Sequence, residues 1–417
     1  MRRVLCLFYY FPPTGGAGAL RCGGMARELL PRGWAASVVA GSVRHHTPGE
    51  DLLARIPAEV TVRRTPAWDL RRLWSPLRHL GVPETAVAGL SRAFLCHADY
   101  ALGWAPFARK AAETLLAEGR FDALLSYGAP WSAHLVAMDL ARRHRLPWLA
   151  GFADPWSTSD EVRWPSPLHR RWARHWEGRV LARADAVLPV TEGVAEALRR
   201  AHPGLSPRLE GIRNGYDEPA FSGLLPKQAN RFTLVHAGTA YPGSSPGPLL
   251  DLLAALVARH PEQRGKLRLR LLGHAATDLA SRAARLGIQD LVVLEGPRPH
   301  AEAVRAMVDA HAIACVFERP GHALARPMKL LDALRAGPSV LGIFPEGEAS
   351  RLLARFPDCA WLKPGDLEGG VRTLSDWMTR WEAGTWPDTG LRPGVEDLSR
   401  SAEAGKLAAL LDTLSAG

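Results

Sequence analysis

Short apolar runs alternate with amphipathic stretches along most of the chain. Several runs are almost continuously apolar, which is typical of strands buried on both faces of a parallel sheet. The stretches between them carry apolar residues at helical spacing, so the alternation predicts βαβ units. The predicted strands are Val4–Phe11, Ala36–Ala40, Val60–Arg64, Ala123–Tyr127, Trp148–Phe152, Ala186–Val190, Phe232–His236, Leu267–Leu272, Leu291–Leu294, Ala312–Phe317, Val340–Phe344 and Trp361–Lys363, with Leu209–Arg213 as a further candidate. The predicted helices are Leu20–Leu30, Ala133–His144, Leu249–His260, Ala301–Ala310, Pro327–Ala336, Leu367–Trp381 and Leu398–Leu414.

The alternation restarts near residue 230, after a segment rich in turn-forming and polar residues, RNGYDEPAFSGLLPKQANR. Within it, Asn214-Gly215 is a turn signal. We therefore predict two doubly wound α/β domains, at 1–215 and 231–390, joined by a linker at 216–230. Residues 391–417 are predicted to form a tail with a terminal helix, for which packing back on the N-terminal domain is one option. A chain of 417 residues suits two domains and leaves three open.

Composition narrows the class of protein. The hydrophobic fraction of 47% and charged fraction of 23% are those of a globular chain, and the net charge of +10 favours anionic partners. Five cysteines without a CxxC pair argue against a disulfide framework or a zinc site and suit a reducing cytosol. The apolar part of MRRVLCLFYYFPP is too short for a signal peptide. No apolar run approaches the ~20 residues of a membrane helix.

Two segments combine tryptophan with arginine. One is Trp68–Leu80, and the other is WPSPLHRRWARHWEGRVLARA, residues 164–184. They could rest on anionic lipid, because tryptophan suits a membrane interface and arginine is drawn to anionic head groups. Alternatively, the second segment is an amphipathic helix whose tryptophans enter the core and whose arginines are solvated. The chain contains no recognised nucleic-acid module, so we expect no nucleic-acid partner.

A glycine-rich turn, PPTGGAG, follows the first predicted strand and precedes the first predicted helix. Glycines such as Gly15 and Gly16 let backbone N–H groups approach an anion, and the N-terminus of the helix adds a favourable dipole. In open α/β sheets, ligands bind at the carboxyl ends of the strands, where this turn lies. The turn matches neither GxGxxG nor a Walker loop, so it predicts an anion site rather than a dinucleotide or ATP site. The alternative is a tight turn without a ligand.

The same region resembles the start of retaining GT-B glycosyltransferases of family 4, which build bacterial polysaccharides and glycolipids. The match begins with YYFPPTGGAGALRCGGMARELLPRGWAASVVAG and continues in order through CHADYALGWAPFA, LLSYGAPWSAHLVA, GFADPWS, ADAVLPVTEGVAEAL, IRNGYD, HAGTAY, LLGH, LEGPRPHAEAVRAM and PMKLLDALRAG. In the second of these segments Ala98 replaces the family's proline. The resemblance covers residues 1–365 at least. It implies two Rossmann-like domains that face each other across a cleft.

The resemblance also suggests site residues. In the first domain it implies catalytic roles for Arg21 and His134, and it places Asp154 and Asp99 near the acceptor. Trp131 could stack on a sugar or enter the core, His134 could be structural, and Asp154 could cap a helix. In the second domain it implies donor binding by Gly238, Thr239, Arg326, Lys329 and Asp332, together with Gly15 and Gly16 of the first.

Three departures from the family pattern affect the donor half. No arginine or lysine stands between Arg231 and Arg259, where relatives often have a basic residue for the phosphates. Leu324 stands where the family often has a glutamate that contacts the donor sugar. Asp332 replaces a glutamate that binds the nucleotide ribose and is one methylene shorter. A surface ion pair between Lys329 and Asp332 is the alternative use of these two residues.

The implied activity is that of a hexosyl or related transferase, which moves a sugar from a nucleoside-diphosphate sugar to an acceptor hydroxyl with retention. The acceptor would be a glycan or a polyprenyl-linked glycan, no metal or other cofactor is expected, and the sequence contains no DxD motif. We expect a cytoplasmic bacterial protein, with a peripheral position on the inner face of the membrane as an option. Residues 214–230 are a candidate hinge. The alternatives are a sugar-nucleotide epimerase of similar fold and a non-catalytic GT-B scaffold protein.

Overall fold

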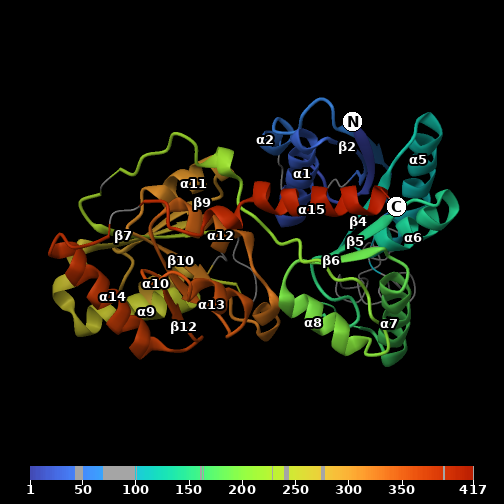
Figure 1. Cartoon of the computed structure of the whole chain (residues 1–417). Coiled ribbons are helices and arrows are strands. Elements are labelled where there is room, and N and C mark those ends of the chain that lie inside the picture. Colours follow the sequence, from blue (N-terminus) through green and yellow to red (C-terminus); the bar gives the residue numbers. More distant parts are fainter. Residues whose placement is uncertain are drawn as a thin grey trace, which may run out of the picture. The chain divides into compact units, whose positions relative to one another are not determined.

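Figure 1 shows the computed structural model of the chain, which describes residues 1–42, 50–68, 99, 101–159, 162, 164–227, 229–238, 244–273, 278–387 and 390–416. Contacts divide the chain into two compact units. The first unit is Met1–Asn214 with Arg400–Gly417, and the second is Gly215–Ser399. The stretch 216–230, predicted as a linker, therefore belongs to the second unit. Residues 391–399 belong there too, whereas the terminal helix belongs to the first unit.

The first unit contains a parallel six-stranded sheet in the order β3-β2-β1-β4-β5-β6. Its strands are β1 Arg2–Leu7, β2 Trp34–Gly41, β3 Thr61–Thr65, β4 Ala123–Gly128, β5 Trp148–Phe152 and β6 Ala186–Pro189. Its helices are α1 Ala17–Leu29, η1 Leu30–Arg32, α2 Glu50–Leu53, η3 Leu102–Trp104, α5 Ala105–Glu118, α6 Ser132–His144, α7 Pro167–Leu181, α8 Glu192–Ala201 and α15 Arg400–Ser415. Residues of β1 alternate between two buried clusters, with Leu5 and Leu7 in the one that α5 and α6 cover and Val4 and Cys6 in the one that α1 and α15 cover.

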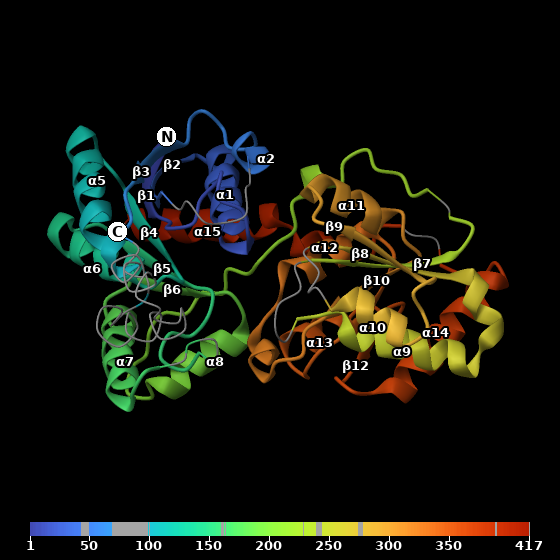
Figure 2. The same ribbon diagram turned by 180° about the vertical axis from the view of Figure 1, so that it is seen from behind.

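The second unit contains a second parallel six-stranded sheet, in the order β12-β11-β10-β7-β8-β9. Its strands are β7 Phe232–Ala237, β8 Leu267–Leu272, β9 Val292–Gly296, β10 Ala312–Val316, β11 Ser339–Ile343 and β12 Ala360–Leu362. Its helices are η4 Glu218–Ala220, α9 Gly247–Arg259, η5 Pro261–Lys266, α10 Leu279–Arg285, α11 His300–Val308, η6 Pro320–Leu324, α12 Met328–Ala336, α13 Glu348–Leu353, α14 Leu367–Glu382 and η7 Glu396–Leu398. Figure 2 shows α9, α10 and α14 on one face of this sheet and α11 and α12 on the other.

The predicted architecture of two doubly wound α/β sheets is confirmed, and the bounds of β5 and β8 are those predicted. The strand predicted at Val4–Phe11 was too long, because β4 pairs with β1 only as far as Leu7. Leu209–Arg213 is not a strand, since only Leu209 forms a bridge, to Val187. The prediction also omitted α5, whose buried positions are mostly alanines and thus give a weak apolar signal.

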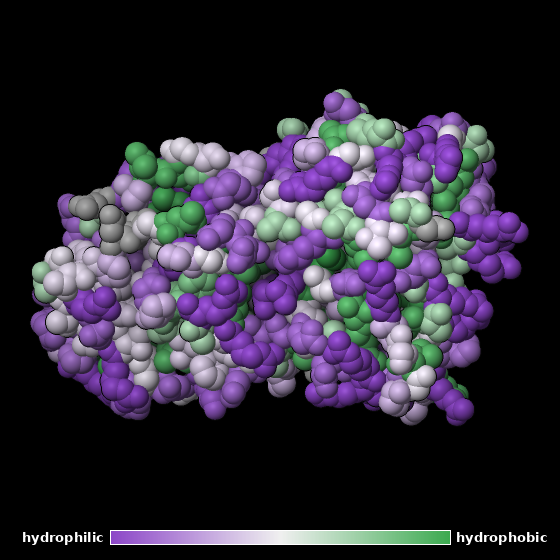
Figure 3. Space-filling view, viewed as in Figure 1, coloured by the Kyte–Doolittle hydropathy of each residue, from purple (hydrophilic) through white to green (hydrophobic). Residues whose placement is uncertain are grey.

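No helix in the described ranges is both long enough and apolar enough to cross a bilayer. On the face shown in Figure 3, hydrophobic residues are interspersed among hydrophilic ones. Cys6, Cys22 and Cys315 are buried free thiols. Burial raises the pKa of the Cys22 and Cys315 thiols to about 12, so both stay protonated and unreactive at neutral pH.

The terminal helix α15 is fixed to the first unit along its whole length. At its start Arg400 is buried against α1, where a Cβ on Gly24 would come within 2.0 Å of the Arg400 Cδ. Near its end Asp412 accepts a hydrogen bond from the indole of Trp34 at 2.9 Å. Leu407 and Leu411 are fully buried between these points. The helix therefore completes the hydrophobic core of the first unit rather than lying loosely on it.

Replacing Gly24 with alanine should destabilise the protein, because the added methyl group overlaps Arg400. We expect the free energy of unfolding to fall by about 1–3 kcal/mol, the usual range for overpacking. Gly405 is the matched control, since it also lies within a helix but its Cβ would meet only Arg32 Nε, at 3.8 Å. Gly405→Ala should be neutral or slightly stabilising, by up to about 1 kcal/mol. Denaturant unfolding of the two variants measures both effects, and equal stability of the two would contradict this account.

Candidate sites at the carboxyl edges of the two sheets

The order of strands reverses once in each sheet. In the first unit the reversal lies between β1 and β4, and in the second between β10 and β7. Open α/β sheets bind ligands beyond the carboxyl ends of the strands at such a switch point. The segments that follow these four strands therefore define a candidate site in each unit.

The glycine-rich turn in the first unit ends at α1. Gly16 is exposed and has a φ of 94°, in the left-handed region that favours glycine. Gly15 is half-buried, and α1 has no acidic residue in its first turn. The backbone at this turn therefore meets the electrostatic requirement for an anion, although the helix terminus alone does not identify one.

Arg21 points into the first unit rather than to solvent. Its side chain is buried, and its Nε donates a hydrogen bond of 2.6 Å to Oδ1 of Asn214. The guanidinium also lies 5.0 Å from the centre of the Tyr127 ring. Arg21 thus links α1 to Asn214, the last residue of the Met1–Asn214 segment of the first unit. This partner was not predicted from the sequence. Its predicted catalytic role stays a prediction.

His134 lies in the first turn of α6, just after β4, and is fully buried. Its Nδ1 is 2.8 Å from Oγ of Ser126, which in turn accepts a hydrogen bond of 2.8 Å from the Trp148 indole. Burial lowers the pKa of His134 to about 3, so the ring is neutral. A Cβ on Gly128 would come within 2.8 Å of His134 Nε2, so this position must be glycine. The predicted contact of His134 with a donor sugar stays a prediction, and in this structure the ring stacks on Phe152 with a centroid separation of 4.7 Å.

Asp99 fixes the turn after β4. Its carboxylate accepts hydrogen bonds from the backbone N–H of Ser132, at 2.7 Å, and of Ala101, at 2.8 Å. It therefore caps the N-terminus of α6, where a negative charge is favoured. Burial nevertheless raises the pKa of Asp99 from 3.8 to about 6. Contact with an acceptor, which the resemblance suggests, remains untested.

Trp131 is buried, as expected from the alternative in which it enters the core. Its ring stacks on Trp156 with a centroid separation of 5.6 Å and an interplanar angle of 4°. Asp154, which follows β5, is exposed at the same edge of the sheet. The stacked pair thus joins the turn after β4 to the turn after β5, and Asp154 is the accessible carboxylate beside it.

Lys329 is the central cation of the second unit. Its Nζ donates to Ser244 Oγ at 3.1 Å and lies 4.3 Å from the centre of the Phe317 ring, at the end of β10. A Cβ on Gly238 would be 3.4 Å from the Lys329 Cδ, so the glycine after β7 lies against this side chain. Burial lowers the pKa of Lys329 to about 8. Within the described ranges, no carboxylate lies at ion-pair distance from its Nζ.

His236 is fully buried beside Lys329 and remains neutral. Its Nδ1 donates to the carbonyl of Ala314 at 3.0 Å, and burial together with the nearby ammonium lowers its pKa to about 3. The charge at the β7–β10 switch point is therefore that of Lys329. Neither His236 nor Ser244 was singled out from the sequence, although both flank the glycine predicted to face the donor.

The other predicted donor residues have partners within the second unit. Arg326 pairs with Glu348 at 3.2 Å, so its charge is balanced there. Asp332 pairs with His300 at 3.4 Å instead of Lys329, and the alternative of a Lys329–Asp332 surface ion pair is therefore wrong. Thr239 lies outside the described residues, as do residues 69–80 of the first tryptophan-rich segment.

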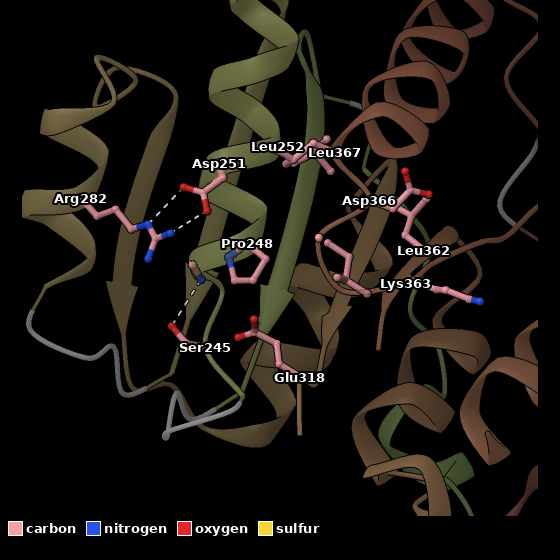
Figure 4. Close-up of a pocket in the computed structure, with 13 residues that line it drawn as sticks. Ser245, Pro248, Asp251, Leu252, Arg282, Glu318, Leu362, Lys363, Asp366 and Leu367 are labelled. Carbon is pink, nitrogen blue, oxygen red and sulfur yellow. Dashed lines mark hydrogen bonds and ion pairs between the residues drawn. The ribbon is translucent and has the colours of Figure 1, made fainter. Parts of the chain in front are cut away.

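A separate pocket of about 300 Å³ lies between the start of α9 and the segment after β12 (Figure 4). Arg282 pairs there with Asp251 at 2.6 Å, and Asp366 accepts from the backbone of Gly369 at 2.9 Å. Glu318 adds a carboxylate near Pro248. Lys363 also lines the pocket but pairs with Glu346 at 3.7 Å. With both cations paired and the Glu318 carboxylate present, this pocket suits a phosphate less than the surroundings of Lys329 do. The described part of the chain holds no cluster of three or more His, Cys, Asp or Glu side chains that could bind a metal.

Comparison with known proteins agrees with this geometry. Residues 16–215, just under half of the chain, match the family described as glycosyl transferase 4-like domain. Sucrose-phosphate synthase from Thermosynechococcus elongatus has a similar structure, with a TM-score of 0.69, 14% sequence identity and 100% of both chains covered. HepE of Anabaena in complex with UDP-glucose gives 0.64 at 15% identity, covering 99% of this chain and 100% of the other. The lipopolysaccharide outer core galactosyltransferase WaaB gives 0.61 at 14% identity, with 99% of each covered.

No curated protein sequence matches the chain. The structural likenesses show that the chain has the two-domain α/β fold of the GT-B glycosyltransferases. Residues 16–215 match a glycosyl transferase 4-like domain. Together these findings support a glycosyltransferase, because the family match and the fold agree and the candidate sites lie at the switch points of both sheets.

The raised pKa of Asp99 predicts a pH dependence of stability. The folded protein holds a proton on Asp99 up to about pH 6, whereas the unfolded chain releases it near the ordinary value of 3.8. The folded state therefore binds more protons between these values, and the free energy of unfolding decreases as the pH rises through them. We expect this contribution to be on the order of 3 kcal/mol, since one pKa unit corresponds to about 1.4 kcal/mol.

Denaturant unfolding at a series of pH values checks this by comparing wild type with Asp99→Ala. The stability difference between the two should shrink as the pH rises from about 4 to about 6. Glu118→Ala, at a half-exposed carboxylate of α5, is the control and should show no such change in this window. A difference for Asp99→Ala that grows with pH would show that the carboxylate is stabilised as an anion instead.

Proposed function

We propose that this protein transfers a sugar, a hexose or related unit, from a nucleoside-diphosphate sugar to an acceptor hydroxyl, with retention of configuration and without a metal. The family match over residues 16–215 and the GT-B fold support the transferase class. UDP-glucose bound to HepE, a structural neighbour, supports a nucleoside-diphosphate donor. The galactosyltransferase of lipopolysaccharide outer core among the neighbours supports a glycan or lipid-linked glycan acceptor and a role in bacterial polysaccharide biosynthesis.

The observation that carries this proposal is the environment of Lys329. Burying an ammonium removes part of its hydration, which is unfavourable unless an opposite charge compensates. The charge of Arg326 is balanced by Glu348, whereas the hydrogen-bond and ring partners of Lys329 are a hydroxyl, a carbonyl and an aromatic ring, all of them neutral. A diphosphate bound beside Gly238 and Lys329 supplies a negative charge to this ammonium.

Lys329 then has a direct role in the reaction. Negative charge accumulates on the diphosphate as the bond to the sugar breaks, and a fixed ammonium stabilises that charge most strongly where water is partly excluded. We propose that Asp332, which pairs with His300, accepts hydrogen bonds from ribose hydroxyls. On the acceptor side we propose that Asp154 binds sugar hydroxyls at the edge of the first unit. We assign no general base, since a phosphate oxygen of the leaving group can take the acceptor proton.

Nucleotide binding tests the donor site. Lys329→Met keeps the length of the side chain but removes its charge, so the Kd for UDP should rise by roughly 10- to 100-fold, in line with the ~1.5–3 kcal/mol of a charged hydrogen bond. Lys266→Met, at an exposed lysine paired with Glu382, is the control and should leave the Kd unchanged. Calorimetric titration with UDP, GDP and dTDP measures this. If none of the three binds wild type at millimolar concentration, the proposed function is wrong.

The pKa of Lys329 adds a signed pH test to the same experiment. Since the ammonium loses its proton near pH 8, the affinity of wild type for UDP should fall between about pH 7 and about pH 9. The nucleotide keeps its charge over this range, because its second phosphate pKa is about 6. Lys329→Met should bind UDP weakly at every pH. An equal dependence of the Kd on pH in both proteins would show that Lys329 is not part of the nucleotide site.

We also propose a cytoplasmic protein that rests on anionic membrane through α7. The tryptophans of this helix are half-buried against the core, whereas Arg171, Arg174 and Leu168 are exposed, Leu168 at 75%. Contact would therefore be made by arginines around one apolar side chain.

Sedimentation with vesicles tests this membrane contact. Wild type should bind vesicles containing phosphatidylglycerol and dissociate as salt screens the charges. Arg171→Gln combined with Leu168→Gln should bind several-fold less, since each basic residue near the surface contributes about 1 kcal/mol. Arg183→Gln, on the segment after α7, is the comparison variant. Unchanged binding by the double variant would show that α7 is not the contact surface.

A further inference from the structure

The turn after β5, residues 153–157 with the sequence ADPWS, is held by a buried carboxylate. Glu177 of α7 is fully buried, with no part of its side chain exposed. Its Oε1 accepts hydrogen bonds from the backbone N–H of Trp156, at 2.7 Å, and of Ser157, at 3.2 Å. Its Oε2 accepts from the Ser157 hydroxyl and from His202 Nε2, the latter at 2.9 Å. Both oxygens are thus fully used within the protein.

Burial of a carboxylate is costly, by several kcal/mol per ion after relaxation, unless its lone pairs are satisfied. At Glu177 three of the four donors come from Trp156 and Ser157, so the charge is used chiefly to hold this short turn. Arg170, two helical turns earlier on α7, donates to the Ser157 carbonyl at 3.1 Å. The same helix therefore holds Ser157 through its N–H, its hydroxyl and its carbonyl.

The held turn connects to the rest of the carboxyl edge. Trp156 is fully buried and stacks on Trp131, and the backbone after Trp131 is in turn bound by Asp99. Asp154 lies two residues before the first amide that Glu177 binds, and it is exposed. The backbone direction at Asp154 is therefore set from one side by Glu177 and from the other by the end of β5, where Ala153 N–H donates to the Gly128 carbonyl at 3.0 Å.

We propose that Glu177 is a positioning residue, which orients the 153–157 turn so that Asp154 meets the hydroxyl groups of the acceptor. Glu177 itself is too deeply buried to touch a substrate. This inference rests on the proposed glycosyltransferase function, because it assigns Asp154 an acceptor. It predicts that loss of Glu177 impairs acceptor use while leaving the nucleotide site of the second unit unaltered.

Three variants test the positioning role. Glu177→Leu keeps the volume and leaves the donors of Trp156 and Ser157 unpaired, whereas Glu177→Gln keeps one carbonyl oxygen for them. Glu196→Gln, at a half-exposed carboxylate of α8, is the matched control. Hydrogen–deuterium exchange followed by mass spectrometry should show faster exchange over 153–158 in Glu177→Leu, a smaller increase in Glu177→Gln and none in the control.

Activity separates positioning from a general defect. Nucleotide release from a UDP-sugar is measured with and without a membrane extract that supplies acceptor. Glu177→Leu should lose roughly 10-fold or more of the acceptor-dependent rate, because misplacement by about 1 Å can cost 100-fold. Its acceptor-independent release and its Kd for UDP should stay within about 2-fold of wild type, and Glu177→Gln should recover part of the loss.

Each remaining outcome has a defined meaning. A folded Glu177→Leu protein with unchanged exchange, or with fast exchange and normal acceptor-dependent release, overturns the positioning role. A parallel loss of both rates and of UDP binding also overturns it, in favour of a purely structural role. If Glu177→Leu does not fold, Glu177→Gln and His202→Gln decide by the same criteria. If wild type binds no nucleotide and releases none, the proposed function has failed, and the exchange data still report whether Glu177 holds the turn.

Discussion

Each unit is built on a parallel sheet that is buried on both faces. The backbone of such a sheet meets solvent mainly at the ends of its strands. At the carboxyl edge the strands end in turns whose N–H groups need acceptors. The first unit supplies these with carboxylates from other segments, Asp99 for the turn after β4 and Glu177 for the turn after β5. The buried carboxylates at this edge are therefore there to accept hydrogen bonds from the backbone N–H groups of the turns.

The two edges balance charge in opposite ways. In the first unit, the buried carboxylates of Asp99 and Glu177 accept hydrogen bonds from backbone N–H groups, so they are satisfied internally. In the second unit, Lys329 has only neutral partners among the described residues, and its neighbour His236 is held in the neutral form. The charge of Lys329 is thus left without a counter-charge in the described part of its unit. This asymmetry is consistent with a rigid platform in one unit and an anion site in the other.

Sequence alone predicted the sheets well, because strands buried on both faces leave continuous apolar runs such as Trp148–Phe152. Helices with alanine-rich buried faces, such as α5, gave no comparable signal. For the site, the structure places the predicted segments after the ends of strands, but the orientation of their side chains was not predictable. Whether Arg21 turned inward or Trp131 reached a sugar depended on partners far away in the chain, Asn214 and Trp156, that no local pattern identifies. The contacts of Glu177 could not be predicted for the same reason, because the local sequence shows only a glutamate on an arginine-rich helix.

The place of α15 has a consequence for how the chain is made. Leu407 and Leu411 belong to the core of the first unit, yet they follow the whole of the second unit in the chain and are synthesised after it. The second unit is one continuous stretch, Gly215–Ser399, and can complete its core while translation is still in progress. The first part of the first unit leaves the ribosome earlier, but the α15 side of its sheet stays uncovered until α15 has followed the second unit out of the ribosome. The order of emergence and the order of completion are therefore reversed.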